Sequence, residues 1–322
     1  MSEPELLRAA RRPLCLGIGG GGDVVGALAT AEHCRLQHDA RPVLGGVTWE
    51  RRPIDPQPGP RSAAEIAGAR PIGPAVLAAG PDTRVRSSGV RFAESRMAEL
   101  LGEEVLLVDA NEGPATIAAG LGAAAAELGC DLLAAVDVGG DVLAHGHEPG
   151  LGSPLCDAVL LAAAVRLEEQ GELPVLGAVF GIGCDGELTP DEVLERLAEL
   201  EAAGATAGAI RMTEPVAARL EQAADLVPTE ASAMAVHAYR GQTGTTAIRA
   251  GRRTVDLRPI AAETRFFRPA PAISSAARLA AAVMDAGDLE AANEALHALG
   301  VYTELDWERD APHTAPGPDA AP

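Results

Sequence analysis

Residues 14–28 read LCLGIGGGGDVVGAL, and this stretch decides the fold class. Apolar residues 14–18 are typical of a short buried strand, and residues 24–36 read as a helix that follows a glycine turn. A strand, a glycine turn and a helix in this order are the start of a βαβ unit, in which the next strand runs parallel to the first.

The same alternation continues along the chain. Further strands are expected at 42–47, 105–108, 132–136, 174–180 and 207–212, and helices at 114–128, 154–169, 189–203 and 214–224. Residues 48–60 are too proline-rich for a helix or a strand and form a loop, followed by a short helix at 61–68 and an edge strand at 84–91. We therefore predict an α/β fold that is Rossmann-like, with a mostly parallel sheet and helices on both faces.

The last third of the chain departs from this pattern. A helix at 229–240 precedes a hairpin of strands 245–249 and 254–258 across Gly251, and alanine-rich helices follow at 273–285 and 289–299. We expect one α/β domain over residues 1–310. A subdivision near residue 225, into a Rossmann-like core and a C-terminal α+β part, stays open. Residues 311–322 are rich in proline and alanine and are expected to be a disordered tail.

Composition excludes several classes of protein. The net charge of −20 disfavours nucleic acid as a partner, because binding to phosphate backbones needs a basic surface. The N-terminus lacks a secretory signal, and the longest uncharged apolar run, residues 158–165, is too short for a membrane helix. The five cysteines form no CxxC pattern, which indicates reduced thiols and a cytoplasmic protein. We also expect a homo-oligomer.

The chain contains no lysine, since all 26 basic residues are arginine. Pyridoxal phosphate chemistry, Schiff-base aldol chemistry and the Walker P-loop each need a lysine amine supplied by the protein. The sequence therefore excludes these three mechanisms.

The glycine turn after the first strand is a candidate site for an anionic ligand. Its glycines match the pattern GxGxxG, in which the backbone and the following helix N-terminus bind phosphate. Asp23 at the start of the helix would repel a phosphate, and the acidic residue Glu50 follows later than in dinucleotide-binding proteins. A tight turn with Asp23 as a helix cap is the alternative. The candidate ligand-binding residues here are Gly17, Gly19, Gly20, Gly21, Gly22 and Asp23.

Carboxylates follow the other predicted strands, where ligands bind in open parallel sheets. Asp137 and Asp141 flank Gly139 and Gly140, which we also assign to cofactor binding, and Asp185 follows a later strand. Carboxylates gathered at one edge repel each other unless a cation is present. A divalent metal such as Mg²⁺, a cationic substrate or sugar hydroxyls would each satisfy them, and capping of helices or turns is the alternative. The candidate catalytic residues are Asp137, Asp141, Asp185 and Glu148.

Three other features have two readings each. His145, His147 and Glu148 could bind a metal or transfer protons, and a solvated turn is the alternative. Trp49 could stack on a base or cover the core. Cys184 is expected to be inert.

The segments GIGGGGDVVGAL, TWERRPIDPQPGPR, AVDVGGDVLAHGHE, SPLCDAVLLA, GIGCDGEL and VPTEASAMAVHAYRGQTG together resemble the domain-of-unknown-function family 1152. This family consists mainly of archaeal and actinobacterial proteins. The resemblance covers roughly residues 14–269 and rests on the same Gly/Asp turns. It implies no particular reaction.

The leading hypothesis is an enzyme that acts on a nucleotide, nucleoside or sugar-phosphate ligand by group transfer or glycosidic-type bond chemistry. Its cofactor stays open, with a nucleotide such as NAD and Mg²⁺ as candidates. The first alternative is a NAD-dependent enzyme, either an oxidoreductase or one resembling deoxyhypusine synthase with a cationic amine substrate. The second is a non-catalytic ligand-binding or scaffold subunit.

Overall fold

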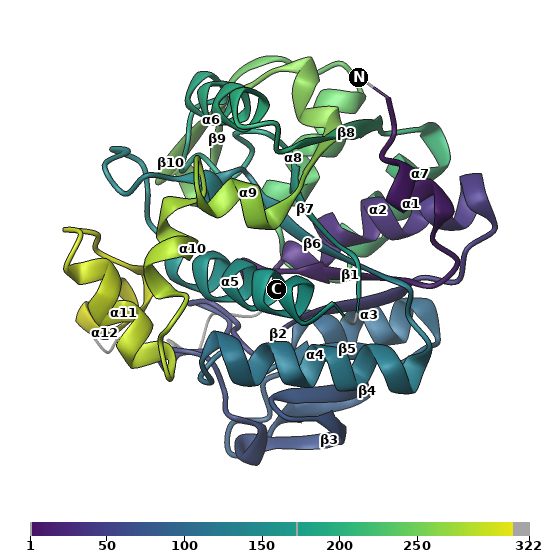
Figure 1. Cartoon of the computed structure of the whole chain (residues 1–322), viewed down its shortest axis with the longest axis vertical. Helices are drawn as coiled ribbons and strands as arrows, with labels where there is room; N and C mark the ends of the chain where they lie inside the picture. The colour runs from purple at the N-terminus through teal and green to yellow at the C-terminus, as the bar shows by residue number, and fades with distance from the viewer. Residues whose placement is uncertain (1, 172, 312–322) are drawn as a thin grey trace.

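A computed structural model describes residues 2–171 and 173–311 (Figure 1). The strands are β1 (Pro13–Gly17), β2 (Val43–Val47), β3 (Ile66–Gly73), β4 (Val76–Val85), β5 (Val105–Val108), β6 (Leu132–Val138), β7 (Val175–Phe180), β8 (Thr206–Arg211), β9 (Gly244–Ile248), β10 (Arg253–Leu257) and β11 (Glu263–Phe267). The helices are α1 (Glu5–Ala9), α2 (Asp23–His38), α3 (Ala93–Leu101), α4 (Pro114–Leu128), α5 (Pro154–Gln170), α6 (Pro190–Ala202), α7 (Glu214–Ala224), α8 (Glu230–Tyr239), α9 (Pro269–Ile273), α10 (Arg278–Val283), α11 (Leu289–His297) and α12 (Glu304–Asp310).

The predicted α/β class with a mostly parallel sheet is confirmed. Nine strands form one sheet in the order β3-β4-β5-β2-β1-β6-β7-β11-β8. The five central strands β5, β2, β1, β6 and β7 are parallel, and their order is that of a Rossmann sheet. The chain builds outward from β1 on one side and then returns to add β6 on the other. The neighbouring ends of β1 and β6 are therefore the point at which the strand order reverses.

Helices cover both faces of the sheet and enclose two apolar cores. One core lies under α4 and α5, which are in front of the sheet in Figure 1, and the other lies under α2 and α7. Gly26 lets α2 approach β6 closely, because a Cβ at this position would lie 2.2 Å from a methyl carbon of Val138. The glycine turn and the first turn of α2 are thereby fixed against the end of β6.

The predictions of two elements near one edge of the sheet are wrong. The helix expected at 61–68 is a single 3-10 turn, Ala63–Glu65, and the edge strand expected at 84–91 ends at Val85. Residues 66–85 instead form the β3–β4 hairpin, which turns at Ala75 with a positive φ of 54°. Glycine and proline interrupt the apolar alternation of these strands, so their sequence pattern is weak.

The C-terminal part of the chain adds one strand to the main sheet, a separate two-stranded hairpin and several helices. The predicted hairpin is present as β9 and β10, which pair antiparallel. The sequence analysis missed β11, which lies antiparallel between β7 and β8 in the main sheet. It also missed α12, which packs near the start of α5 together with α11 (Figure 1). The tail expected at 311–322 lies outside the described residues from 312 onward.

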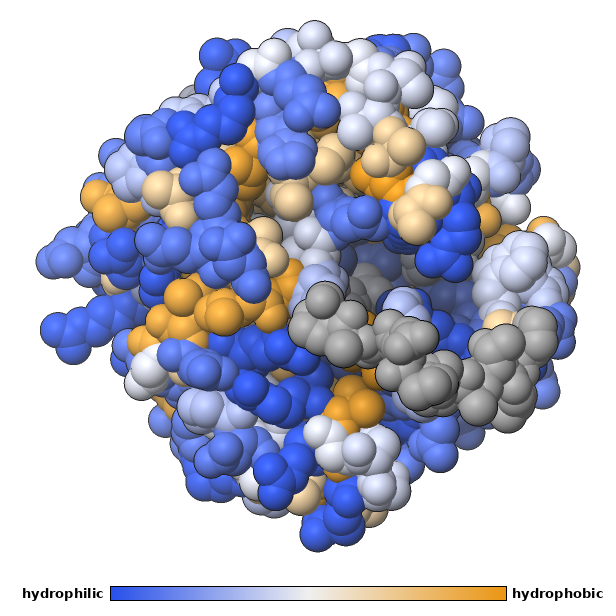
Figure 2. Space-filling model, turned by 180° about the vertical axis from the view of Figure 1, so that it is seen from behind, coloured by the Kyte–Doolittle hydropathy of each residue, from blue (hydrophilic) through white to orange (hydrophobic). Residues whose placement is uncertain are grey.

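Figure 2 shows one face on which hydrophilic residues predominate and hydrophobic residues form separate small patches. Among the described residues, every helix is too short or too polar to cross a membrane.

Candidate functional site

Acidic side chains meet where β1 and β6 end. Asp137 is the last residue but one of strand β6, and Asp23 is the first residue of α2, which follows β1. Asp157 comes from the first turn of α5, and its helix begins after the loop that follows β6. One oxygen from each of these three carboxylates lies within 4.8 Å of the others. Ligands in open α/β sheets bind at this reversal of strand order, so the three side chains stand at the expected place.

A second group of acids adjoins the first. Oxygens of Asp141, Asp185 and Glu187 also lie within 4.8 Å of one another, and after burial the charge of Asp137 is the largest cause of the raised pKa of Asp141. The six side chains Asp23, Asp137, Asp141, Asp157, Asp185 and Glu187 are called the acidic cluster below. The structure thus brings together Asp23, Asp137, Asp141 and Asp185, which the sequence placed at one edge.

Burial makes ionisation of the cluster unfavourable. Burial raises the pKa of Asp23 to about 7 and the pKa of Asp185 to about 8. It also holds the pKa values of Asp137, Asp141 and Asp157 well above the usual range, and the neighbouring carboxylates add to the rise. The cluster therefore lacks sufficient positive charge from the protein itself to keep all its members ionised.

Glycines make room for these carboxylates. A Cβ on Gly139 would lie 2.3 Å from Cγ of Asp185, and a Cβ on Gly19 would lie 2.5 Å from Oδ2 of Asp23. Gly139 and Gly140 also adopt φ values of 124° and 119°, which other residues rarely take. Gly19 and Gly139, which the sequence analysis assigned to ligand binding, thus leave the space that the side chains of Asp23 and Asp185 occupy.

The carboxylate of Asp23 occupies part of the glycine turn. Its Oδ2 accepts hydrogen bonds from the N–H of Gly19 (3.0 Å) and from that of Val138 (3.3 Å). The N-cap residue of α2 is Gly22, which has no side chain that could accept a hydrogen bond, so the alternative of Asp23 as an ordinary helix cap is wrong. The N–H of Gly21 donates to the carbonyl of Trp49. Phosphate binding by Gly17, Gly20 and Gly22 and their neighbours stays a prediction.

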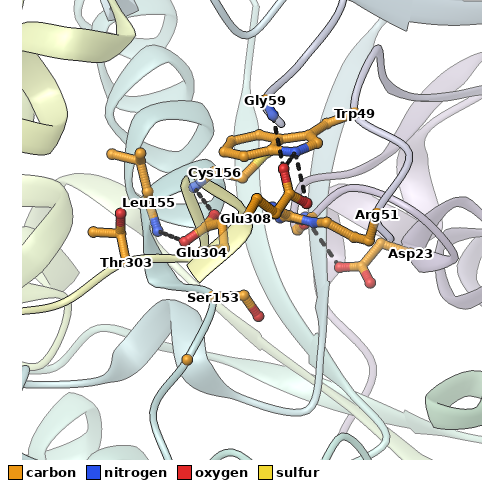
Figure 3. A network of polar contacts seen from close by, with 12 residues as sticks. Asp23, Trp49, Arg51, Gly59, Ser153, Leu155, Cys156, Thr303, Glu304 and Glu308 are labelled. Carbon is orange, nitrogen blue, oxygen red and sulfur yellow. Dashed lines mark hydrogen bonds and ion pairs between the residues drawn. The ribbon is translucent and has the colours of Figure 1, made fainter. Parts of the chain in front are cut away.

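Helix α12 lies against the site through two buried glutamates (Figure 3). Glu304 accepts hydrogen bonds from the N–H groups of Leu155 (3.0 Å) and Cys156 (2.9 Å) in the first turn of α5. It also pairs with Arg51, whose guanidinium stacks on Trp49 at 4.0 Å from the ring centroid. The N-terminus of α5 is therefore occupied by a carboxylate of the chain.

Glu308 fixes the same helix to Trp49. Its Oε2 accepts hydrogen bonds from the indole Nε1 of Trp49 (3.1 Å) and the N–H of Gly59 (2.7 Å). Trp49 is fully buried, so it covers the core here. The sequence analysis did not single out Glu304 or Glu308, because their partners are about 150 and 250 residues away in sequence and no local pattern marks them.

Replacing Glu308 should loosen α12. Glu308→Ala leaves the indole N–H of Trp49 buried without its acceptor, so we expect a loss of about 1–3 kcal/mol in the free energy of unfolding, measured in urea. The control is Glu290→Ala, because Glu290 of α11 is an exposed partner of Arg309 and should cost less than about 1 kcal/mol. Equal losses in the two variants would contradict the anchoring role of Glu308.

Glu148 lies apart from the acidic cluster. Its oxygens accept hydrogen bonds from the N–H groups of His145 and Gly146 (both 2.8 Å) and of His147 (3.1 Å). Burial opposes its ionisation, but these bonds outweigh it and lower its pKa. Glu148 thus holds the turn that carries the two histidines, and His145 contacts Arg196 on α6. The catalytic assignment of Glu148 has no direct support from this placement.

Other acidic residues at this edge of the sheet have partners in the protein. Asp109 accepts hydrogen bonds from the N–H groups of Ala63 (2.7 Å) and Asn111 (3.0 Å). Glu50 accepts one from the N–H of Ala93 at the start of α3. The thiol of Cys184 is buried, and burial raises its pKa.

A hollow with a volume of about 390 Å³ adjoins the acidic cluster. Arg252, Arg253 and Trp307 line it together with the loop around Gly150, and the next residues of that loop donate hydrogen bonds to Glu187. Trp307 is 58% exposed. Cationic and aromatic side chains thus line the hollow, and Gly186 in its wall lies between Asp185 and Glu187 in the sequence.

The comparisons with known proteins identify a family. The family model described as "Protein of unknown function (DUF1152)" matches residues 14–312, which confirms and extends the resemblance found over residues 14–269. No curated protein and no solved structure gives a match.

Proposed function

The chain belongs to the DUF1152 family, and we propose that it is an enzyme acting on a nucleotide, nucleoside or sugar-phosphate ligand by group transfer or glycosidic-type bond chemistry. One observation supports this above all: buried carboxylates converge where the strand order of a Rossmann sheet reverses. Buried carboxylates without matching positive charge reduce stability, and such strain is characteristic of sites arranged for function.

The residues that line the hollow support the proposal of a phosphate-containing ligand. Arg252 hydrogen-bonds the carbonyl of Arg249, and Arg253 bonds the carbonyls of Gly150 and Gly186. Both guanidinium groups line the hollow, where they would attract an anion. Trp307 offers an exposed ring on which a base or sugar could stack. The anionic part of the ligand would lie against the arginines and its reacting part against the acidic cluster.

The aspartates supply two chemical roles in this proposal. With its pKa raised to about 8, Asp185 is largely protonated at neutral pH and can donate a proton to a leaving group. Burial also raises the pKa values of Asp137 and Asp141, so either would ionise only beside a bound cation, and would then stabilise positive charge that develops on a sugar ring in an oxocarbenium-like transition state. Asp137, Asp141 and Asp185 are thus the residues whose replacement by asparagine should remove activity.

A cationic amine substrate is the second candidate, and the unpaired buried acids favour it. A polyamine would neutralise the acidic cluster directly. This candidate corresponds to the alternative of an enzyme that resembles deoxyhypusine synthase. The two candidates differ in ligand charge, so a binding panel separates them.

Thermal unfolding in the presence of candidate ligands tests the proposal. The panel contains AMP, ADP, ATP, NAD, ribose 5-phosphate and spermidine, each with EDTA and with Mg²⁺. A ligand at 100 times its Kd stabilises the folded state by about 2.7 kcal/mol, which raises Tm by roughly 5 °C in a protein of this size. A shift with at least one phosphate compound is expected. A shift with spermidine alone would favour the amine, and no shift with any compound would contradict both.

A pair of arginine variants locates the binding site. Arg252→Ala should weaken the binding of the phosphate compound at least tenfold, because it removes a cation from the hollow. Arg211→Ala serves as the control, because Arg211 is exposed on β8, where it pairs with Glu263, and should bind as the wild type does. Calorimetric titration measures both. Equal affinity of the two variants would place the anion elsewhere.

A further inference from the structure

We propose that Asp23, Asp137 and Asp157 form a binding site for one divalent cation of the oxygen-preferring kind, Mg²⁺ or Mn²⁺. The site lies within the acidic cluster, so its role in catalysis rests on the proposed function, whereas the binding of the ion does not. The three side chains come from α2, β6 and α5, which are separate in sequence and meet at the reversal of strand order.

Unpartnered oxygens mark this group as a place for a ligand. Oδ1 of Asp137 and Oδ1 of Asp157 are both buried, and neither has a hydrogen-bond partner among the described residues. The two residues are 1% and 2% exposed. A buried polar atom without a partner costs about 1–3 kcal/mol, and more if it is charged. Both atoms belong to the three carboxylates whose oxygens approach within 4.8 Å, so a single ion between them would satisfy both.

Arg51 does not neutralise this group. Burial raises the pKa values of Asp23 and Asp157, and Arg51 offsets only part of this rise. Its Nη2 donates to the carbonyl of Gly19 at 2.6 Å and pairs with Glu304 at 3.2 Å. Glu304 is itself a buried carboxylate, so Arg51 already compensates one negative charge. Three further acids remain, and a divalent ion supplies the charge that is missing.

The second group of acids is less suited to an ion. Both oxygens of Glu187 accept hydrogen bonds, from the N–H groups of Gly152 and Ser153 and from the hydroxyl of Ser153. Arg249 and Arg253 lie 3.6 and 3.7 Å from Glu187 Oε1. Hydrogen-bond donors and arginines of the protein therefore stabilise the Glu187 carboxylate without a metal. Among the described residues, Asp157 has no hydrogen bond or ion pair of this kind.

The donor set indicates the kind of ion. The three ligands are carboxylates, and the group contains no histidine or thiolate, which zinc prefers. Mg²⁺ binds oxygen at about 2.1 Å, keeps several waters and is commonly held by one or two carboxylates with substrate phosphates completing its shell.

Titration of the metal-free protein with Mn²⁺ alone tests the inference. The EPR signal of free Mn²⁺ is followed in phosphate-free buffer, after treatment with EDTA and dialysis. We expect one Mn²⁺ bound per chain and competition by Mg²⁺. Spermidine competes only if the amine occupies the same acids.

Asp157→Asn should lower the affinity for Mn²⁺ at least tenfold while the apo protein keeps or raises its Tm, because the amide relieves repulsion and Asp157 Oδ1 has no hydrogen bond to lose. Asp137→Asn should act in the same way and is the second variant if the first does not fold. Asp191→Asn is the matched control, because it removes one negative charge at an exposed partner of Arg258 and should bind Mn²⁺ as the wild type does.

The outcomes separate the two proposals. Absence of Mn²⁺ binding by the folded wild type, or equal Mn²⁺ affinity in Asp157→Asn and Asp191→Asn, would overturn the metal site. Neither result depends on the panel of phosphate compounds. Binding of Mn²⁺ with no response to that panel would leave the metal site in place and contradict the substrate class.

Discussion

Metal-free protein should lose stability as the pH rises from 5 to 7. The carboxyl groups of Asp185 and Glu50 ionise near pH 4 in the unfolded chain, but burial raises their folded-state pKa values to about 8 and about 7. Between these limits the folded state binds more protons than the unfolded state, so rising pH favours unfolding. The stability that these groups contribute is fully present below about pH 4 and is lost once the pH exceeds their folded pKa values.

The expected effect is large. A group that is protonated in the folded state and ionised in the unfolded state changes stability by about 1.4 kcal/mol per pH unit. These two groups alone should lower the free energy of unfolding by about 3–5 kcal/mol between pH 5 and pH 7, and the other acids of the cluster, whose pKa values are also raised, add to the fall. Arg249 and Arg253 lower the pKa of Asp185, and Arg96 and Arg51 lower that of Glu50, but burial outweighs them.

Urea unfolding in EDTA at a series of pH values measures this slope. Glu50→Gln should make the slope shallower, because one of the groups no longer titrates. Asp191→Asn should leave it unchanged, since Asp191 is exposed and Arg258 lowers its pKa. Excess Mn²⁺ should also flatten the slope if the metal site exists. A stability that is constant or rises over this range in EDTA would show that the buried carboxyls are not held protonated.

Much of the arrangement at the carboxyl edge could be predicted from the sequence. Asp23, Asp137, Asp141 and Asp185 each lie at or just beyond the end of a strand of a parallel sheet, and parallel strands end at one edge. Alternation of strands and helices was therefore enough to bring them together. Their chemical roles are a separate matter, which the position of a residue after a strand does not determine.

Other members of the site could not be found in this way. Asp157 lies within a helix, and only the packing of α5 against the sheet turns it toward Asp23. Glu304 belongs to a short helix whose partners, Leu155 and Cys156, are about 150 residues earlier. Glu148 was assigned to catalysis from its position in the loop, and the structure shows that its oxygens bind the backbone of that loop; its catalytic role stays a prediction. Long-range packing, which local patterns do not contain, places Asp157 and Glu304 in the site.

The glycine turn gives the last prediction, because two readings of it lead to different results. If Gly19 makes room for carboxylates, Gly19→Ala should weaken Mn²⁺ binding at least tenfold without any phosphate present. The new methyl group would lie 2.5 Å from Oδ2 of Asp23 and 3.0 Å from Oδ2 of Asp157, so the two acids must move apart. Such overpacking also costs about 1–3 kcal/mol of stability.

Gly80→Ala is the matched control, because a Cβ at Gly80 in β4 meets no atom within 4 Å. This variant should change the free energy of unfolding by less than about 0.5 kcal/mol and leave Mn²⁺ binding as it is in the wild type. EPR titration and urea unfolding measure both variants. If Gly19→Ala instead keeps the wild-type Mn²⁺ affinity but loses binding of a phosphate compound, the turn serves the phosphate directly, as its GxGxxG pattern suggests. The carboxylates would then tolerate the added methyl, and the packing role of Gly19 would be wrong.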